Sequence, residues 1–555
     1  MKGYVSRRGF LKAMGLGAAS MAIPGCMGGT GRLLGEGSGD RPNIILIMAD
    51  DMGYSDIGCY GGEIQTPNLD RLAANGLRFT QFYNTARCCP TRASLMTGLY
   101  AHQTGMGWMT AANLGYEGYG GDLNNRCVTI AEVLKRSGYS TYMAGKWHVT
   151  YDGYFDGPKH SWPCQRGFER FYGTLSGGGN YFDPKALTRD NTRIKATSEG
   201  YYYTDAISDN AAKFIREHDL SKGDEPYFLY VAYTSPHWPL HAKPHDIERY
   251  RGKYMKGWDA LRAERHKRMI EMGLVEESWE ITPRDVKAKS WDEVDASKKE
   301  LWDLRMAVYA AQIDCMDQGI GRIVSVVEKS GKLNNTLIMF LSDNGGCAEG
   351  ISRAKKDIKL LGAEDSFESY RINWANASNT PFRLYKHWVH EGGIATPLVV
   401  HWPKGFKARG ELRHQPGHVI DVMATCADIT GAKYPRKHKG KKIVPLEGKS
   451  LVPAFGNRPI EREAIYWEHE GNRAIRVGKW KLVARGKKGA WELYDLEAER
   501  TELNDLAKWY PERAKEMAEM WQRWAERSNV LPLDGRGWNE RLKSDKGPPL
   551  AEGKI

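Results

Sequence analysis

Long hydrophobic runs are missing from this 555-residue chain. No stretch of about 18 consecutive apolar residues occurs, and a membrane-spanning helix needs roughly that length. A disorder-prone composition is missing as well, because 41% of the residues are hydrophobic and 27% are charged, as in globular proteins. The sequence therefore excludes a membrane-spanning protein and a largely disordered one. Its length is enough for one large α/β domain and a smaller one.

Cysteine is scarce, with nine residues in the whole chain. When Cys26 and Cys88 are set aside, an odd number remains, and these cysteines are scattered without close pairing. This pattern argues against a disulfide framework. We expect the others to be small core residues rather than metal ligands, and they are Cys59, Cys89, Cys127, Cys164, Cys315, Cys347 and Cys426.

A strong charge imbalance is also absent. The formal net charge is +12, and part of it comes from Lys2, Arg7, Arg8 and Lys12 near the N-terminus. A modest positive excess steers anionic substrates toward a protein, but it does not indicate nucleic-acid binding. We expect the basic run 433–442 to be a solvated loop, with polyanion binding as the alternative.

The N-terminal residues resemble a targeting segment. Residues 6–12, Ser-Arg-Arg-Gly-Phe-Leu-Lys, are similar to a bacterial twin-arginine export signal. The sequence Ile-Pro-Gly-Cys that ends at Cys26 resembles a lipoprotein cleavage box with an unusual proline, so lipidation and simple cleavage both stay open. We expect residues 1–26 to be the signal and 27–41 to be a glycine-rich linker. Export by the twin-arginine translocase would place the protein in the periplasm or at the cell surface, with a lipid anchor on Cys26 if that residue is lipidated.

Continuous apolar runs at 43–48, 336–341 and 397–402 predict strands that are buried on both faces, as in a parallel sheet. Strands that alternate with helices predict a doubly wound α/β sheet with helices on both faces. The helical patterns between the strands lie at 68–75, 129–137, 205–218 and 301–330, the last as one helix or two.

Composition changes near Gly440, which places a catalytic domain at 42–442 and a smaller subdomain at 443–532. A helix is predicted from Pro511, where the missing N–H does no harm. The subdomain is therefore expected to be α+β, an antiparallel sheet plus a helix, and residues 533–555 a loose tail. The strand candidates are 464–467, 473–477, 481–484 and 491–494, and the apolar face of the helix holds Ala514, Met517, Trp521 and Trp524.

Carboxylates follow two of the predicted strands. Asp50 and Asp51 come directly after the first strand, and Asp343 and Asn344 stand in the same relation to the strand at 336–341. Ligands of open parallel sheets bind beyond the carboxyl ends of the strands. Carboxylates that converge there repel one another unless a cation lies between them. Three carboxylates and an amide oxygen form a hard oxygen set that suits calcium or magnesium better than zinc.

The segment Cys88-Cys89-Pro90-Thr91-Arg92 resembles the Cys-x-Pro-x-Arg signature of the type I sulfatases. Other segments match this branch of the alkaline-phosphatase-like superfamily in chain order. They are Asp50-Asp51, Gly145-Lys146-Trp147-His148, Ser235-Pro236-His237-Trp238-Pro239, Asp343-Asn344-Gly345-Gly346, and Lys386 with Glu391-Gly392-Gly393. Segments 103–109, 373–376 and 467–472 resemble the bacterial arylsulfatase group.

The resemblance implies an alkaline-phosphatase-like fold, with a doubly wound, mixed, mostly parallel sheet, and a modified cysteine. In this family the signature cysteine is oxidised to Cα-formylglycine by a formylglycine-generating or anaerobic sulfatase-maturating enzyme. The hydrated aldehyde then attacks the sulfate ester. A calcium ion, in preference to magnesium, would be bound by Asp50, Asp51, Asp343, Asn344 and residue 88.

The resemblance also implies roles for the remaining site residues. Arg92, Lys146 and Lys386 would hold the sulfate oxygens. His237, with Lys386, would give a proton to the leaving group, and His148 would take one from the second hydroxyl of the hydrate. An exchange of these two histidine roles stays open. His469 and Asn472 either reach the substrate or serve only the structure.

The expected activity is hydrolysis of sulfate monoesters, either aryl sulfates or sulfated carbohydrates, with release of inorganic sulfate. The first alternative is a phosphate or phosphonate monoester hydrolase of the same superfamily. The second is a surface lipoprotein that binds sulfated glycans without turnover.

Overall fold

An 11-stranded mixed sheet forms the centre of the computed structural model, which describes residues 41–353 and 360–547. The strand order is β10-β2-β9-β8-β1-β7-β3-β4-β5-β6, and β11 pairs with β2. The strands are β1 (Asn43–Ala49), β2 (Leu77–Tyr83), β3 (Ser140–Gly145), β4 (Arg170–Thr174), β5 (Leu187–Arg189), β6 (Thr192–Arg193), β7 (Tyr227–Ala232), β8 (Thr336–Ser342), β9 (Ala395–His401), β10 (Glu411–Arg413) and β11 (Gly417–His418).

The predicted mixed, mostly parallel sheet is confirmed. Strand β1 is parallel to β7 and β8, and β3 is parallel to β7 and β4. The apolar run 397–402 departs from the prediction, because β9 is antiparallel to both of its neighbours, β2 and β8. An apolar run indicates burial on both faces, but it carries no information about strand direction.

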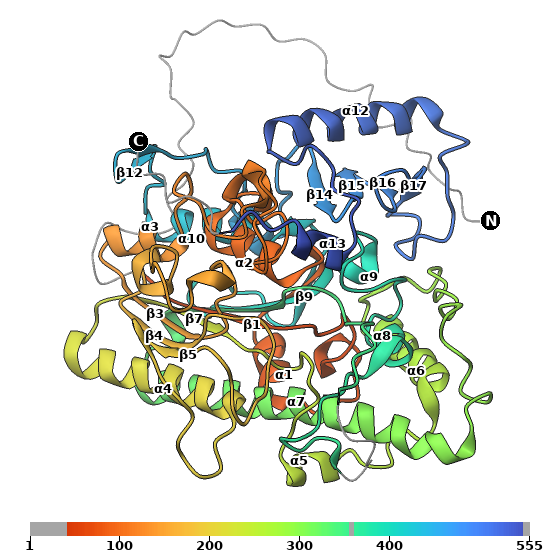
Figure 1. Ribbon diagram of the computed structural model, residues 1–555, viewed down its shortest axis with the longest axis horizontal. Coiled ribbons are helices and arrows are strands. Elements are labelled where there is room, and N and C mark those ends of the chain that lie inside the picture. Colours follow the sequence, from red (N-terminus) through yellow and green to blue (C-terminus); the bar gives the residue numbers. More distant parts are fainter. Residues whose placement is uncertain (1–40, 354–359, 548–555) are drawn as a thin grey trace, which may run out of the picture. The chain divides into compact units, whose positions relative to one another are not determined.

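Helices cover both faces of the sheet (Figure 1). Successive side chains of β1 point to opposite faces, so Ile45 and Ile47 join one hydrophobic core while Ile44 and Leu46 join the other. The first core includes residues of α1 (Pro67–Ala74), α4 (Tyr203–Lys222), α5 (Pro244–Glu248), α6 (Gly257–Glu271), α7 (Ala296–Lys329) and α8 (Arg371–Ser378). The second includes residues of α2 (Cys88–Thr97), α3 (Ile130–Arg136), α10 (Asp421–Thr430) and α11 (Val452–Phe455).

The predicted helix over 301–330 is one continuous helix, α7, of 34 residues. Despite that length, none of the helices in the described part of the chain is both long and apolar enough to cross a bilayer. The cysteines predicted to be core residues are buried, except Cys164, which is half-buried. Described cysteines form no disulfide with one another.

A second, four-stranded antiparallel sheet follows in the chain, as predicted. Helix α12 (Pro511–Arg527) begins at the predicted proline, and its Met517, Trp521 and Trp524 form a separate core with Ile475 and other sheet residues. The strands are β14 (Ile465–His469), β15 (Asn472–Val477), β16 (Trp480–Ala484) and β17 (Trp491–Asp495).

Two segments predicted to be irregular are ordered. The basic run contains a short hairpin of β12 (Lys437–His438) and β13 (Lys441–Lys442). The prediction of a loose tail is wrong for its first part, because α13 (Trp538–Lys543) forms there and buries Arg541 against Glu470. This long-range ion pair leaves no signal in local composition.

The boundary after residue 442 stays a prediction, since the described chain from Arg41 onward is one compact unit.

The predicted export signal, Cys26, almost all of the linker, and residues 548–555 of the tail lie outside the described residues.

Candidate active site

The carboxylates predicted to converge do so at the carboxyl ends of β1 and β8. These strands are adjacent and parallel, with Ala49 paired to Ser342, so the residues that follow them meet at one edge of the sheet. The backbone N–H of Asp51 donates to Asp343 Oδ1 at 3.2 Å, and Asn344 Nδ2 donates to Asp51 Oδ1 at 2.7 Å. The side chains are buried, and Asp51 takes a left-handed φ of 67° that is uncommon for a residue with a Cβ.

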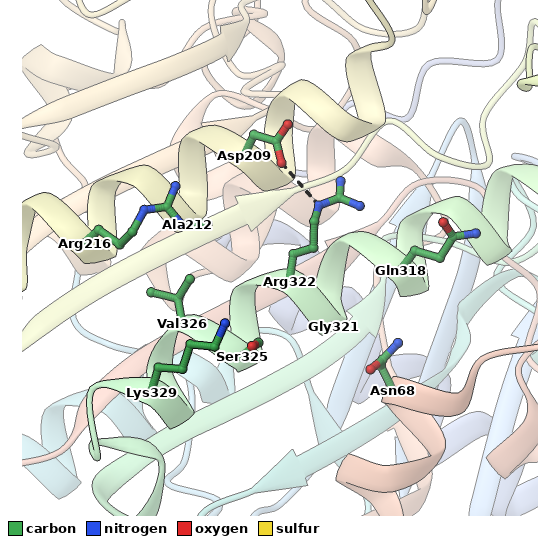
Figure 2. A pocket seen from close by; sticks show the side chains of 10 residues that line it. All are labelled: Asn68, Asp209, Ala212, Arg216, Gln318, Gly321, Arg322, Ser325, Val326 and Lys329. Carbon is green, nitrogen blue, oxygen red and sulfur yellow. Dashed lines mark hydrogen bonds and ion pairs between the residues drawn. The ribbon is translucent and has the colours of Figure 1, made fainter.

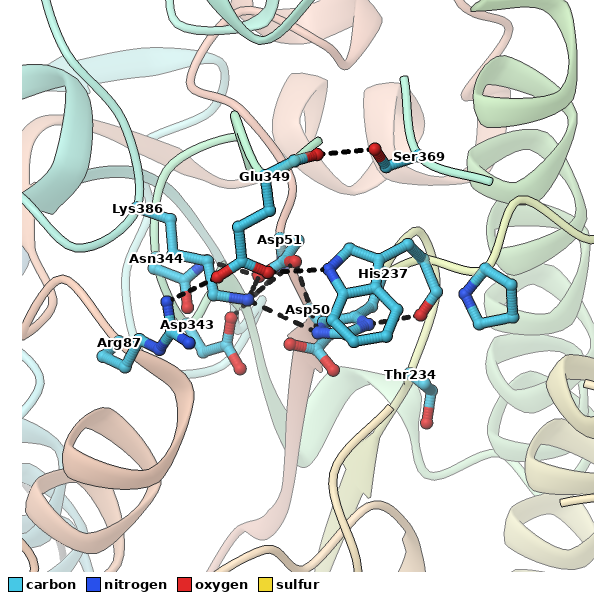
Figure 3. Close-up of polar contacts among 12 residues, drawn as sticks. Asp50, Asp51, Arg87, Thr234, His237, Asp343, Asn344, Glu349, Ser369 and Lys386 are labelled. Carbon is cyan, nitrogen blue, oxygen red and sulfur yellow. Dashed lines mark hydrogen bonds and ion pairs between the residues drawn. The ribbon is translucent and has the colours of Figure 1, made fainter. Parts of the chain in front are cut away.

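Three buried cations face these three carboxylates (Figure 3 shows Lys386 beside Asp51). Lys146 Nζ lies 2.5 Å from Asp50 Oδ2, Arg92 Nη2 lies 2.7 Å from Asp343 Oδ2, and Lys386 Nζ lies 2.8 Å from Asp51 Oδ1. Buried charges are tolerated only when they are paired in this way. The pairs therefore hold the three cations in fixed positions at this edge of the sheet.

The ionisation of the two innermost carboxyls differs. Burial raises the pKa of Asp343 well above its ordinary value, and the neighbouring Asp50 adds to this effect. Burial also disfavours the charged form of Asp50, but Lys146, then His237 and Arg92, hold the pKa of that carboxyl below its ordinary value. Burial is the larger cause of the Asp343 shift and repulsion by Asp50 the second, and an additional cation would relieve both.

Two buried oxygens fit such a cation. Asp50 Oδ1 and Asn344 Oδ1 have no hydrogen-bond partner within the described ranges 41–353 and 360–547. A buried oxygen without a donor is costly, by about 1–3 kcal/mol, unless something else satisfies it. Carboxylate and amide oxygens are preferred ligands of calcium, so Asp50, Asp51, Asp343 and Asn344, which are the predicted ligands other than residue 88, fit that ion.

Cys88 begins helix α2 and lies beside His148. Three atoms lie within 4.8 Å of one another here: Cys88 Sγ, Cys89 Sγ and one ring nitrogen of His148. The hydrogen bond from Cys89 lowers the pKa of Cys88 well below its ordinary value, and Lys146 and His148 add to this against the effect of burial. Burial lowers the pKa of His148, which favours the neutral imidazole that a general base requires.

His237 lies on the other side of the cluster, against Lys386. Its Nδ1 lies 2.5 Å from the carbonyl oxygen of Trp238, which can only accept, so Nδ1 carries the hydrogen. Its Nε2 then faces Lys386 Nζ and Asp51 Oδ2, each at 3.4 Å. Burial opposes the charge on Lys386, but Asp51 raises the pKa of that ammonium well above its ordinary value. Lys386 therefore stays protonated beside His237, whose own pKa is lowered by burial, so the lysine is the proton source of this pair.

The structure thus brings the predicted site residues into one cluster: Asp50, Asp51, Cys88, Arg92, Lys146, His148, His237, Asp343, Asn344 and Lys386. Their individual roles stay predictions. His469 and Asn472 are both buried, and Asn472 Nδ2 donates to the carbonyl oxygens of His387 and His469. These contacts favour the structural alternative for Asn472.

Sequence analysis missed two glycines that pack on the candidate acid and base. A Cβ added to Gly177 would lie 2.7 Å from Cε1 of His148, and one added to Gly178 would lie 2.4 Å from Cε1 of His237. A Cβ at Gly179 would meet no described atom within 4 Å. The run of three glycines was the available signal, but only the tertiary structure shows what it contacts.

Sequence analysis also missed two charged residues at the edge of the cluster. Arg87 directly precedes Cys88, and its Nη1 lies 2.8 Å from Glu349 Oε1. Glu349 comes three residues after the Asp343-Asn344-Gly345-Gly346 segment. That proximity is the one local feature of the sequence that could have indicated a place near the site.

A groove of about 580 Å³ lies elsewhere, between α4 and α7 (Figure 2). Its charged lining includes Asp209, Arg216, Arg322 and Lys329. No predicted site residue lines it, so this groove is separate from the cluster around Cys88.

Comparison with known proteins gives a consistent result over most of the chain. The family model described as "Sulfatase" matches residues 42–432, and the one described as "N-sulphoglucosamine sulphohydrolase, C-terminal" matches residues 382–529. An uncharacterized sulfatase of Schizosaccharomyces pombe is 34% identical over 87% of this chain and 93% of its own length. An arylsulfatase of Klebsiella aerogenes is 33% identical over 74% of this chain and 91% of its own length.

A solved structure is similar as well. The crystal structure of Ps i-CgsB in complex with k-i-k-neocarrahexaose has a TM-score of 0.66 and 28% identity, and it covers 92% of this chain and 98% of its own.

Proposed function

The chain belongs to the sulfatase family and is a sulfuric ester hydrolase, and from this premise we propose a mechanism and a substrate class. Sulfate monoesters are hydrolysed with a formylglycine formed from Cys88, a calcium ion at the strand ends, and release of inorganic sulfate. One observation carries the proposal: Cys88 opens helix α2 beside His148, whose pKa burial lowers, next to a carboxylate cluster in which Asp50 Oδ1 and Asn344 Oδ1 have no hydrogen-bond partner among the described residues.

The modified residue supplies the nucleophile. A formylglycine hydrate carries two hydroxyls, one to attack sulfur and a second whose deprotonation lets the bond to the transferred sulfate break. His148 lies where it can take that proton. A serine or an unmodified cysteine has no second hydroxyl, so it cannot finish the reaction in this way.

The cations of the site bind and orient the ester. Arg92 and Lys146 are fixed by their carboxylate partners, and both lie close enough to Cys88 to interact with it electrostatically. Fixed charges stabilise the developing negative charge without reorganising during the reaction. Calcium, held by Asp50, Asp51, Asp343 and Asn344, supplies further positive charge to the sulfate oxygens when it is bound.

His237 and Lys386 serve the leaving group. The Lys386 ammonium lies 3.4 Å from His237 Nε2, which carries no hydrogen because the ring hydrogen is on Nδ1. The proton for the departing oxygen therefore comes from Lys386 through Nε2, and the lysine is left neutral. This step matters most for alkyl and sugar alcohols, because their oxyanions are poor leaving groups. A roughly 100- to 10,000-fold contribution is typical of such general acid catalysis.

We infer a sulfated carbohydrate as the substrate class. Ps i-CgsB was crystallised with a neocarrahexaose, and the family-model match over residues 382–529 is to the C-terminal part of a sulphoglucosamine sulphohydrolase. Because the sequence resembles the bacterial arylsulfatase group, we expect the enzyme to hydrolyse artificial aryl sulfates too, and these can serve as test substrates.

Maturation and export complete the proposal. A formylglycine-generating or anaerobic sulfatase-maturating enzyme acts on the unfolded chain, and folding follows in the cytoplasm. The twin-arginine translocase then carries the folded protein to the periplasm or the cell surface, consistent with residues 6–12. The test is cell fractionation of the full chain beside an Arg7→Lys, Arg8→Lys variant, which should stay in the cytoplasm.

The chemistry is tested by the mass of the tryptic peptide Cys88–Arg92. Formylglycine makes this peptide about 18 Da lighter than the thiol form. Purified protein should also release sulfate from a sulfated sugar faster than it releases phosphate from the matched phosphate ester. Active protein with an unmodified thiol would overturn the mechanism, and a preference for phosphate would favour a phosphate or phosphonate hydrolase.

A further inference from the structure

Glu349 links the two sides of the active site. Its Oε1 accepts a hydrogen bond from Arg87 Nη1 at 2.8 Å, and its Oε2 accepts one from the indole Nε1 of Trp238 at 2.9 Å. Arg87 is the residue before Cys88, and Trp238 is the residue after His237. Figure 3 shows the Glu349 carboxylate directed toward the space between Arg87 and Lys386.

The backbone of Glu349 is itself held in place. Ser369 Oγ donates to the carbonyl oxygen of Glu349 at 2.5 Å, and the same Oγ accepts from the N–H of Ile351 at 3.0 Å. The Glu349 side chain is 31% exposed, so it lies at the edge of the cluster rather than inside it. Burial alone would raise the pKa of Glu349, but Arg87, then Lys386 and His237, hold it well below its ordinary value. The Glu349 carboxyl that forms this link is therefore ionised at neutral pH.

Trp238 transmits the position of Glu349 to His237. The Trp238 carbonyl oxygen fixes Nδ1 of His237, and the two rings pack with their centroids 4.5 Å apart. A Trp238 side chain that lost its acceptor would have a half-buried indole N–H without its protein partner, which favours rotation of the ring. Rotation would remove the packing surface that orients His237 Nε2 toward Lys386.

We propose that Glu349 is a positioning residue for proton transfer to the leaving group, acting on His237 through Trp238. The inference rests on the proposed function. The Glu349 side chain bonds to Arg87 and Trp238 and not to Cys88, so its loss should spare the attack step. The effect should therefore grow as the leaving group becomes more basic.

Three variants separate this role from a general structural one. Glu349→Ala removes both hydrogen bonds, whereas Glu349→Gln keeps an amide oxygen that can accept from Trp238 Nε1. Trp238→Phe keeps an aromatic ring but removes the donor, without changing any charge. A matched control is Glu328→Ala. This variant removes an exposed carboxylate of α7 that pairs with Arg71 of α1.

The experiment compares kcat/KM for 4-nitrophenyl sulfate with kcat/KM for a sulfated sugar or simple alkyl sulfate, in the wild type and in each variant. Glu349→Ala and Trp238→Phe should slow the alkyl substrate about tenfold more than the aryl one, since small misplacements of catalytic groups cost up to roughly 100-fold. Glu349→Gln should recover most of that difference, and Glu328→Ala should match the wild type.

Equal losses on both substrates, or a loss confined to KM, would overturn the inference, as would a Trp238→Phe variant with unchanged selectivity. Each variant is first checked for conversion of Cys88 by peptide mass and for its melting temperature. Failure of the proposed function shows itself separately, because the wild type would then release no sulfate from either substrate.

Discussion

Lys481 Nζ, on β16 of the C-terminal sheet, lies 2.8 Å from Glu391 Oε1, and both side chains are fully buried. Glu391 follows Lys386 by five residues and opens the short helix α9 (Glu391–Ile394). Its second oxygen accepts from Arg500, and Lys481 also pairs with Glu502. The C-terminal sheet therefore anchors the segment that carries a candidate catalytic lysine.

Replacement of this lysine should destabilise the protein. Lys481→Met leaves Glu391 and Glu502 buried with fewer positive partners, and removing one member of a buried pair costs about 3–5 kcal/mol. We expect a lower free energy of unfolding in urea. Lys479→Met is the control, since Lys479 lies two residues away at the surface and should leave the unfolding curve nearly unchanged. Equal stability of both variants would contradict this account of the ion pair.

Substitution of Cys88 should stop turnover. Cys88→Ser offers one hydroxyl but no second one, so the enzyme should either carry a stable sulfate ester or lose activity. Intact-protein mass spectrometry after incubation with substrate distinguishes these two results. Cys89→Ser is the matched control, because Cys89 is not the signature cysteine, and this variant should still be converted at position 88. Normal turnover by Cys88→Ser would refute the mechanism.

Chelation should remove activity, and calcium should restore it. Asn344→Ala deletes the amide oxygen that has no partner among residues 41–353 and 360–547. We expect calcium affinity, measured by isothermal titration, to fall by at least about 10- to 100-fold. Asn75→Ala, at an exposed helix end, should bind calcium as the wild type does. Full activity in metal-free protein would exclude the calcium site.

A single added methyl group should distinguish three adjacent glycines. Gly177→Ala and Gly178→Ala place a Cβ against the rings of His148 and His237, whereas Gly179→Ala places one in open space. We expect the first two to lower kcat by about 100-fold, because displaced catalytic groups lose their geometry. Gly179→Ala should keep wild-type kcat. Similar kcat values for all three variants would show that the loop tolerates the contact.

Much of the local structure was predictable from short segments. The apolar runs at 43–48 and 336–341 became β1 and β8, and α12 begins at Pro511 as its sequence indicates. These features depend on residues that are neighbours in the sequence, so their apolar pattern and backbone preferences can be read from a short segment. The direction of β9 was not predictable, because the same apolar pattern suits both pairings.

The sequence by itself determined which chemistry this protein carries: the cysteine signature, the carboxylates after two strands, and the lysines and histidines of the site. Only the tertiary structure decided how those groups are held. Arg87 and Glu349 are 262 positions apart, and Lys481 and Glu391 are 90 apart. Contacts at such separations arise when the sheet and helices pack, so they depend on three-dimensional proximity and leave no periodic pattern in the sequence.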